Sequence, residues 1–187
     1  MTAGARLAAP ADLAAAAEVL TAAFMEYPWT RYVLPEDDYP GRLLELQRLY
    51  LTHALHYGIV AVSAHVAGVI ALLPPDAPQP ARSVITRIVA LHGDRIDRLA
   101  SNPHPHLDWR LETLGVLPDA RGSGIGGALI RFALEESARR GARAVRLETS
   151  DERNVRLYER HGFGVIEYVD AGGAPPIWTM RAVVPAQ

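Results

Sequence analysis

The sequence predicts a mixed α/β fold that closes with an antiparallel pair of strands. Short apolar runs bounded by turn residues, typical of strands, alternate with helical patterns along the chain. A glycine-rich loop at 121–127 separates a strand-like run from a helix-like run. The last two strand-like runs are joined across Gly172-Gly173, so we expect the chain to close with an antiparallel pair.

Composition limits the functions that the chain can serve. Its 187 residues fit one domain, and we expect a single domain over residues 1–187. A net charge of −2 gives no reason to expect a nucleic-acid partner. The absence of cysteine excludes disulfides, thiolate metal sites and a cysteine nucleophile. No apolar run approaches the ~20 residues that span a bilayer, so we expect a cytoplasmic protein without a membrane partner.

The first half predicts two helices followed by two strands. Apolar residues recur at helical spacing in the first helix, and proline and glycine mark the element ends. In order, we expect a strand at 6–8, a helix at 10–26, a loop at 28–41, a helix at 41–57, and strands at 59–63 and 66–73.

The second half predicts strands and helices in alternation. The sequence Thr149-Ser150-Asp151-Glu152 matches a capping box and predicts the start of a short helix. In order, we expect a helix at 81–100, a loop at 101–106, a strand at 107–117, a helix from the glycine loop to 140, a strand at 144–148, a helix ending at 162, and strands at 163–169 and 177–183.

The loop Arg121-Gly122-Ser123-Gly124-Ile125-Gly126-Gly127 predicts an anion site. Four glycines would be costly inside a helix, but at a helix start they let a ligand approach backbone N–H groups that have no intrahelical partner. Those donors and the positive end of the helix dipole favour a phosphate group.

A dinucleotide-binding fingerprint is the first alternative for this loop. Gly122, Gly124 and Gly127 match its spacing, and Glu148 ends the next strand, where a ribose-binding acid would lie. However, residues 117–121 separate the loop from its strand, and the segments downstream do not repeat βαβ units. A nucleotide-hydrolase loop would need a lysine, and the chain has none.

A second pattern covers more of the chain. Arg121-Gly122-Ser123-Gly124-Ile125-Gly126 follows a long strand, and about thirty residues later comes the run Asn154-Val155-Arg156-Leu157-Tyr158-Glu159-Arg160-His161-Gly162-Phe163. Together these motifs resemble the GNAT superfamily of N-acetyltransferases over residues 107–181. The runs 109–116, 147–150 and 176–180 are similar to the branch that contains puromycin N-acetyltransferase.

This resemblance implies the GNAT fold, an α/β fold in which helices flank a single mixed, mostly antiparallel sheet, with a splayed strand pair that holds acetyl-CoA. Residues 107–183 would form the acetyl-CoA-binding core, and residues 1–106 would form mainly the substrate side. The backbone of Leu114, Gly115 and Val116 would pair with the pantetheine amides. The loop from Arg121 to Gly127 would hold the pyrophosphate.

The resemblance also implies roles on the helix near 154–158. Asn154 would contact the pantetheine end, and Tyr158, one turn later on the same face, would be the general acid that protonates the departing thiolate. A phenol with a pKa near ~10 is reasonably matched to a thiol. The alternative for Tyr158 is a core tyrosine that packs beside Phe163.

The amine acceptor must lose a proton, and a carboxylate is the usual base. Superfamily members often place a glutamate six residues before Val116, where this chain has Arg110. Glu112 lies two residues further on, on the same face, and is the first candidate base. Glu148 is the second. Either acid could instead be a solvated or ion-paired strand residue.

The acceptor pocket is expected in the first helical pair and its loop. Tyr27, Trp29 and Tyr32, together with Phe24 and Tyr50, are available as aromatic walls. Glu26 and the acids at 36–38 could attract a cationic amine. Core packing and solvated loop charge are the alternatives for each.

We expect an acetyl-CoA-dependent enzyme that acetylates a small-molecule amine directly, without a metal. His104, His106 and Asp108 alternate, but chance explains this in a proline-broken loop. Protein N-termini or lysines are other possible acceptors, and a non-catalytic acyl-CoA sensor is the alternative class. A homodimer is possible, because dimers are common in the resembled family.

Overall fold

The computed structural model describes residues 4–99 and 107–185. The predicted loop at 101–106, with His104 and His106, lies outside the described residues. The helices and strands run in the order β1 (Ala5–Leu7), α1 (Leu13–Phe24), α2 (Pro28–Val33), α3 (Tyr39–Tyr57), β2 (Ile59–Ser63), β3 (Gly68–Leu73), α4 (Arg82–His92), β4 (Trp109–Val116), α5 (Ile125–Arg139), β5 (Ala144–Thr149), α6 (Glu152–Glu159), β6 (Gly164–Val169) and β7 (Ile177–Val183).

The described strands form one mixed sheet in the order β1-β2-β3-β4-β5-β7-β6. Only the contact between β4 and β5 is parallel, and the other neighbours pair antiparallel. The mostly antiparallel sheet and its closing pair β6–β7 confirm the predicted fold class. The last strand, β7, inserts between β5 and β6.

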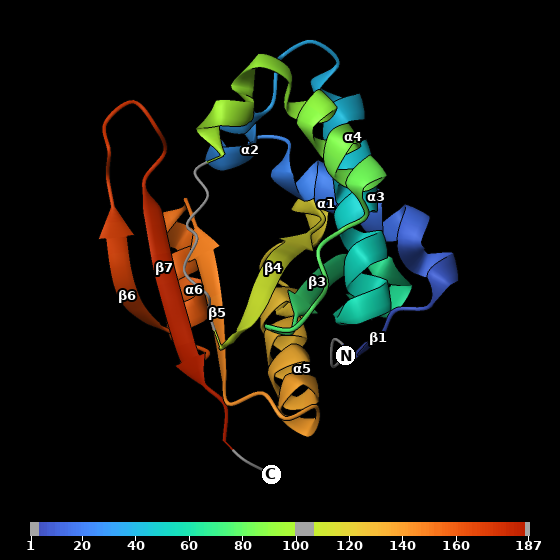
Figure 1. The fold of residues 1–187 in the computed structure, drawn as a ribbon. Coiled ribbons are helices and arrows are strands. Elements are labelled where there is room, and N and C mark those ends of the chain that lie inside the picture. The colour runs from blue at the N-terminus through green and yellow to red at the C-terminus, as the bar shows by residue number, and fades with distance from the viewer. Residues whose placement is uncertain (1–3, 100–106, 186–187) are drawn as a thin grey trace.

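Strands β4 and β5 separate soon after they meet. Their register contains only Trp109 opposite Val145 and Arg110 opposite Arg146, although β4 continues to Val116. Figure 1 shows β4 leaning away from β5 beyond this paired end. The predicted splayed strand pair is therefore present.

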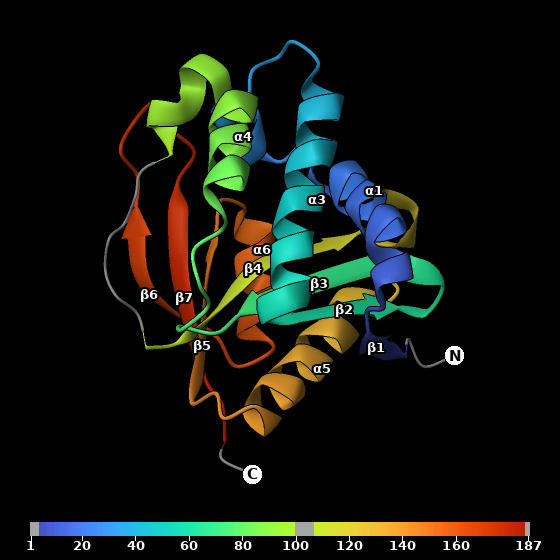
Figure 2. The same ribbon diagram turned by 45° about the vertical axis from the view of Figure 1, so that its right-hand side comes forward.

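Two apolar clusters cover the two faces of the sheet. One joins Leu129 and Ile130 of α5 to β2, β3, β4, β5 and β7. The other joins α1 and α3 to β2 and β3, through residues such as Leu20 and Leu51. Figure 2 shows α1 and α3 on one face and α5 on the other. A third cluster joins α2, α3 and α4 beside the splayed strands.

The predicted loop at 28–41 is wrong, because α2 and the start of α3 lie there. Pro28 and Pro40 stand in the first turns of these helices, where a missing N–H group costs nothing. Tyr39 is 2% exposed and its hydroxyl donates to Thr30 Oγ1 at 2.9 Å. Proline was interpreted as a helix breaker where it begins helices.

Other boundaries differ for local reasons. Helix α4 ends at His92, because Gly93 takes a φ of +54°, and a 3₁₀ turn continues to Arg98. Strand β3 begins only at Gly68, because His65 and Val66 have positive φ. The predicted capping box at 149–152 is wrong: the N-cap of α6 is Asp151, whose side chain accepts from the Arg153 N–H group at 2.8 Å.

Candidate active site

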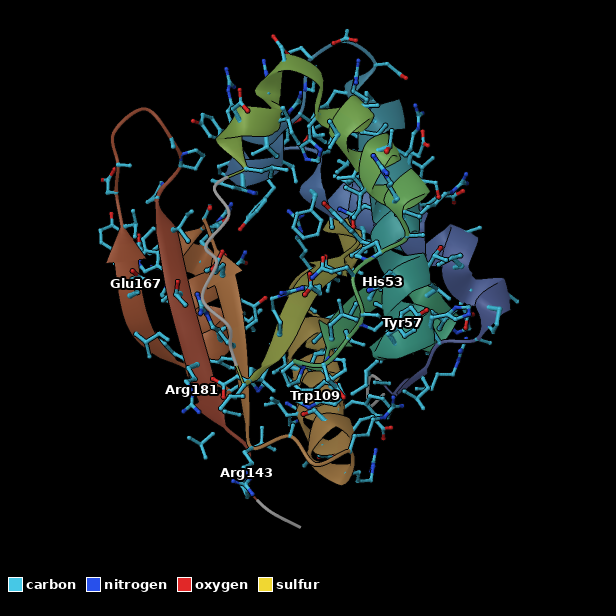
Figure 3. All side chains as sticks on the ribbon, in the orientation of Figure 1. His53, Tyr57, Trp109, Arg143, Glu167 and Arg181 are labelled. Atoms are coloured by element: carbon cyan, nitrogen blue, oxygen red, sulfur yellow. The ribbon has the colours of Figure 1, made fainter. Side chains whose placement is uncertain are left out.

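A cavity of about 290 Å³ lies where the splayed strands face the N-terminal helices. Its walls come from both halves of the chain: Glu112 and Leu114 of β4, Glu148 of β5, Asn154 and Tyr158 of α6, and Tyr27 before α2. The ion pair between Arg181 Nε and Asp108 Oδ2, at 2.7 Å, ties β7 to the residue before β4 at the end of the sheet where the strands are still paired. Figure 3 labels Arg181 and Trp109 at this end.

Glu112 occupies a β-bulge. Leu72 of β3 pairs with Leu111 and Ala71 pairs with Thr113, so Glu112 has no partner opposite it. Such a bulge re-aims a side chain. The Glu112 side chain is ion-paired with Arg110 and 26% exposed. Burial raises the pKa of its carboxyl, although the charge of Arg110 and its hydrogen bond work against the shift. A carboxylate in this setting is suited to accept a proton.

Glu148 faces the same cavity from the opposite strand. Its side chain is 50% exposed, and its Oε1 atom lies 3.1 Å from Arg146 Nη2. Both candidate bases therefore line one space, but Glu112 is the more enclosed of the two.

Asn154 and Tyr158 share the cavity face of α6, one turn apart. Tyr158 is 6% exposed and packs against Phe163, with 5.5 Å between the ring centroids. Its hydroxyl makes no hydrogen bond within the described residues. Burial raises the pKa of Tyr158 above its ordinary value of 10.0. The phenol is thus protonated at neutral pH, as a proton donor to a departing thiolate must be.

The glycine loop leads from β4 into α5 with its backbone open. Gly122 and Gly124 have φ angles of +78° and +83°, and no atom lies within 4 Å of the position that a Cβ would take. Within the described residues, no carbonyl or side chain accepts from the N–H groups of Gly122 to Gly127. These free donors at the start of a helix fit a pyrophosphate.

Side chains of the loop hold it against the rest of the fold. The Ser123 hydroxyl donates to the Ala120 carbonyl at 2.6 Å, and Arg121 donates to the Ala23 carbonyl at the end of α1 at 3.0 Å. Ile125 packs against the α5 side of the sheet. Gly126 would tolerate a Cβ, which would lie 3.7 Å from Leu157, whereas a Cβ on Gly127 would meet His161 at 2.8 Å.

The backbone of Leu114, Gly115 and Val116 pairs with β3 on one side only. Their other side faces the opening toward β5. At Gly115 a Cβ would come within 2.8 Å of Leu20 in α1. Glycine here lets α1 pack tightly over β4.

The predicted acceptor walls are only partly brought together. Tyr27 and Trp29 line the cavity, as do Phe24 and Tyr50. The Tyr27 hydroxyl accepts from the Ser150 N–H group at 2.7 Å, which joins the N-terminal half to the end of β5. Tyr27 therefore both lines the cavity and links the N-terminal half to the end of β5.

Glu26 and Tyr32 do not belong to this lining. The Glu26 side chain is 81% exposed and pairs with Arg31 at 3.0 Å. Tyr32 lies under the Arg98 guanidinium, 4.9 Å from the ring centroid. This placement gives no support to either residue as a wall of the acceptor pocket.

Three residues that line the cavity were not predicted from the sequence: Gln47, His92 and Thr113. Gln47 of α3 is 6% exposed and His92 at the end of α4 is 1% exposed. Thr113 Oγ1 is fully buried without a hydrogen-bond partner among the described residues. Such an atom costs ~1–3 kcal/mol of stability. Gln47 could have been noticed as the one polar residue among the buried positions of α3, which otherwise hold leucine, alanine and tyrosine.

Among the residues that the structure describes, no three His, Asp or Glu side chains gather as a metal site would require. In the same part of the chain, none of the helices has the length and apolar character needed to cross a membrane.

Comparison with known proteins defines the class. Residues 21–163 match the model of the acetyltransferase (GNAT) family. The chain belongs to this family.

Solved structures agree with the assignment. A histone acetyltransferase HPA2 and related acetyltransferase from Corynebacterium glutamicum is 26% identical over 100% of this chain and 99% of its own, with a TM-score of 0.77. A second acetyltransferase is 25% identical over 97% of this chain and 100% of its own, with a TM-score of 0.64. The fold also matches yncA from Salmonella typhimurium, solved with its cofactor acetyl-CoA, at 19% identity over 100% and 96% of the two chains and a TM-score of 0.60.

Proposed function

We propose that this acetyltransferase is an N-acetyltransferase that uses acetyl-CoA and transfers the acetyl group directly to a primary amine of a small molecule. One observation carries the proposal: the opening between β4 and β5 borders a cavity lined by two carboxylates and a buried phenol. The same strand β4 leads into a loop of free N–H groups.

The C-terminal half holds the donor. Acetyl-CoA, when bound, supplies an activated acetyl group as a thioester. The N–H groups of Gly122 to Gly127 bind its pyrophosphate, and the free edge of Leu114 to Val116 pairs with the pantetheine amides. Asn154 contacts the pantetheine end; its position in the cavity lining, with Nδ2 3.3 Å from Thr149 Oγ1, supports this role. Residues 107–183 are thus the donor side.

Glu112 and Tyr158 handle the protons. Glu112 accepts a proton from the ammonium group of the acceptor, directly or through a water molecule, and the resulting neutral amine attacks the thioester carbonyl. Tyr158 donates a hydrogen bond to the sulfur as the thiolate departs. Glu148 is the second candidate base. Direct transfer in a ternary complex is proposed because the chain has no cysteine to carry the acetyl group.

The N-terminal half supplies the acceptor side. A volume of about 290 Å³ is at the small end for ligand pockets and suits a small amine better than a folded protein surface. Glu112 and Glu148 bring two carboxylates to the cavity, with which an ammonium group can pair. Tyr27 and Trp29 provide its aromatic walls.

The test is thiol release from acetyl-CoA in the presence of a panel of primary amines. We expect amine-dependent release by the purified protein and a raised melting temperature with CoA. Binding of acetyl-CoA without release for any amine would favour the acyl-CoA sensor. Thiol release with protein N-termini or lysine peptides, but with no small amine, would show that the acceptor is a protein.

A further inference from the structure

The cavity contains a glutamine that its surroundings leave without a partner. Gln47 projects from the buried side of α3 and is 6% exposed. It lines the cavity, and its amide makes no hydrogen bond within the described residues. Leucines flank it at Leu43, Leu46 and Leu51, all buried. Its amide atoms are not among the fully buried atoms that lack a partner, so they are accessible, and a ligand in the cavity that Gln47 lines can reach them.

Thr113 is a second unpartnered group in the same wall. It follows Glu112 in β4, and its buried Oγ1 atom has no hydrogen-bond partner among the described residues. Thr113 pairs in register with Ala71 of β3, which also lines the cavity. Gln47 from helix α3 and Thr113 from strand β4 thus line the same cavity.

His92 adds a hydrogen-bond acceptor to this wall. Its Nδ1 atom lies 2.8 Å from the Ile88 carbonyl. Since a carbonyl only accepts, Nδ1 carries the proton and Nε2 is left as an acceptor in the neutral ring. Burial lowers the pKa of His92, which keeps the ring uncharged. No arginine is among the described residues that line the cavity.

The charged groups of the cavity therefore lie on one side of it and the neutral groups on the other. Both carboxylates, Glu112 and Glu148, lie on the splayed strands. The groups of α3, α4 and Thr113 are polar but neutral, and the remaining wall there is apolar, with Leu46, Leu51 and Leu99. A ligand that satisfies this wall needs a group that both donates and accepts hydrogen bonds but carries no charge.

We propose that Gln47 and Thr113 form the part of the acceptor site that selects the amine, by binding an uncharged hydroxyl group of the acceptor. The preferred acceptors are then amino alcohols, amino sugars among them, rather than alkylamines or diamines. This inference rests on the proposed N-acetyltransferase activity. Discrimination follows because an acceptor without the hydroxyl leaves the buried Gln47 and Thr113 groups unpaired, and a second ammonium meets no anion on this wall.

The test compares kcat/KM for a series of amino alcohols with alkylamines that carry a methyl group in place of the hydroxyl, and with diamines of equal length. Wild-type protein should prefer the best amino alcohol at least about tenfold. Gln47→Leu and Thr113→Val should each remove most of that preference, mainly through KM for the hydroxyl compound. Both should leave KM for acetyl-CoA unchanged.

Thr52→Val is the matched control. Thr52 lies on the exposed side of the same helix, and its hydroxyl donates to the Arg48 carbonyl at 2.7 Å. Its substitution should leave the preference intact. Because Gln47→Leu and Thr113→Val change different elements, misfolding of one, detected from its melting temperature, still leaves the other as a test.

Two failures are distinguishable. Acetylation of amines with an amino-alcohol preference that neither variant changes, or with no preference at all, would overturn this inference and leave the proposed function standing. An absence of thiol release with every amine would overturn the proposed function, and this inference with it.

Discussion

At the scale of single residues, the position of Glu112 depends on a β-bulge that the sequence pattern did not predict. Two residues after Arg110, it was expected on the same strand face, and the ion pair between the two side chains agrees with that. Its unpaired place in β4, opposite the step from Ala71 to Leu72, is set by the register of β3. Register is a tertiary property, so the sequence predicted the residue but not its geometry.

Replacing Tyr158 with Phe should lower kcat at least about tenfold, because the departing thiolate loses its hydrogen-bond donor. Folding stability should change little, since the hydroxyl has no partner in the described structure. Steady-state kinetics and a thermal melt check both points. Tyr168→Phe on the exposed strand β6 is the control and should retain full turnover. Near-wild-type kcat in Tyr158→Phe would remove Tyr158 from the reaction.

The acidic limb of the pH profile of kcat should belong to Glu112. Because burial raises the pKa of its carboxyl, the limb should lie above the ordinary glutamate value of ~4.3. The pH profile of Glu112→Gln should lack this limb, and its kcat should fall about 10²-fold. The profile of Glu148→Gln should keep the limb. Measuring kcat at saturating amine keeps the titration of the free amine out of the profile. The reverse outcome would make Glu148 the base.

The same substitution should stabilise the fold at neutral pH. The pKa of Glu112 is higher in the folded than in the unfolded state, so ionisation above the folded pKa costs folding free energy. Glu112→Gln should therefore melt at a higher temperature than wild type at pH ~8, and the difference should vanish below about pH 4, where both states are protonated. The substitution also removes the ion pair with Arg110. Because the Arg110 side chain is 63% exposed, this ion pair contributes little to folding stability. A lower melting temperature at pH 8 would contradict this account.

At the scale of elements, turn chemistry decided which boundaries could be predicted. The end of α5 was expected at Gly141, which has a φ of +86° and follows basic residues in the last turn. The helices α2 and α3 were missed because their prolines lie in first turns, where a helix tolerates them. The capping box at 149–152 failed because the chain stays in β5 through Thr149 and leaves Asp151 as the cap.

Gly124→Ala should weaken acetyl-CoA binding about tenfold, and Gly141→Ala should not. Both glycines have similar positive φ angles, +83° and +86°, with no atom within 4 Å of a Cβ, so both substitutions should cost about 1 kcal/mol of stability. Only Gly124 lies in the loop of free N–H groups, whose alignment a strained alanine would disturb. KM for acetyl-CoA and melting temperature separate the two effects. Equal KM values in the two variants would argue against pyrophosphate binding by this loop.

At the scale of the whole molecule, the fold class and the cofactor could be predicted from the sequence, whereas the residues that meet in the cavity could not. The glycine loop and the run at 154–163 are local motifs, and the order of strands around them led to the correct fold class. The acceptor wall combines Gln47, Thr113 and His92 from a helix, a strand and a helix end. Nothing local links them, because only packing of the N-terminal helices over the splayed strands brings them together.

Direct transfer of the acetyl group from acetyl-CoA to the amine is the central prediction for this protein. Mass spectrometry of the protein and of the small molecules, after incubation with acetyl-CoA alone and with acetyl-CoA plus an amino alcohol, measures this directly. We predict N-acetylated amine and free CoA in equal amounts when both substrates are present, with no acetylated protein in either mixture. An acetylated protein that forms with acetyl-CoA alone and passes its acetyl group to the amine, or binding of acetyl-CoA without any product, would contradict direct transfer to an amine.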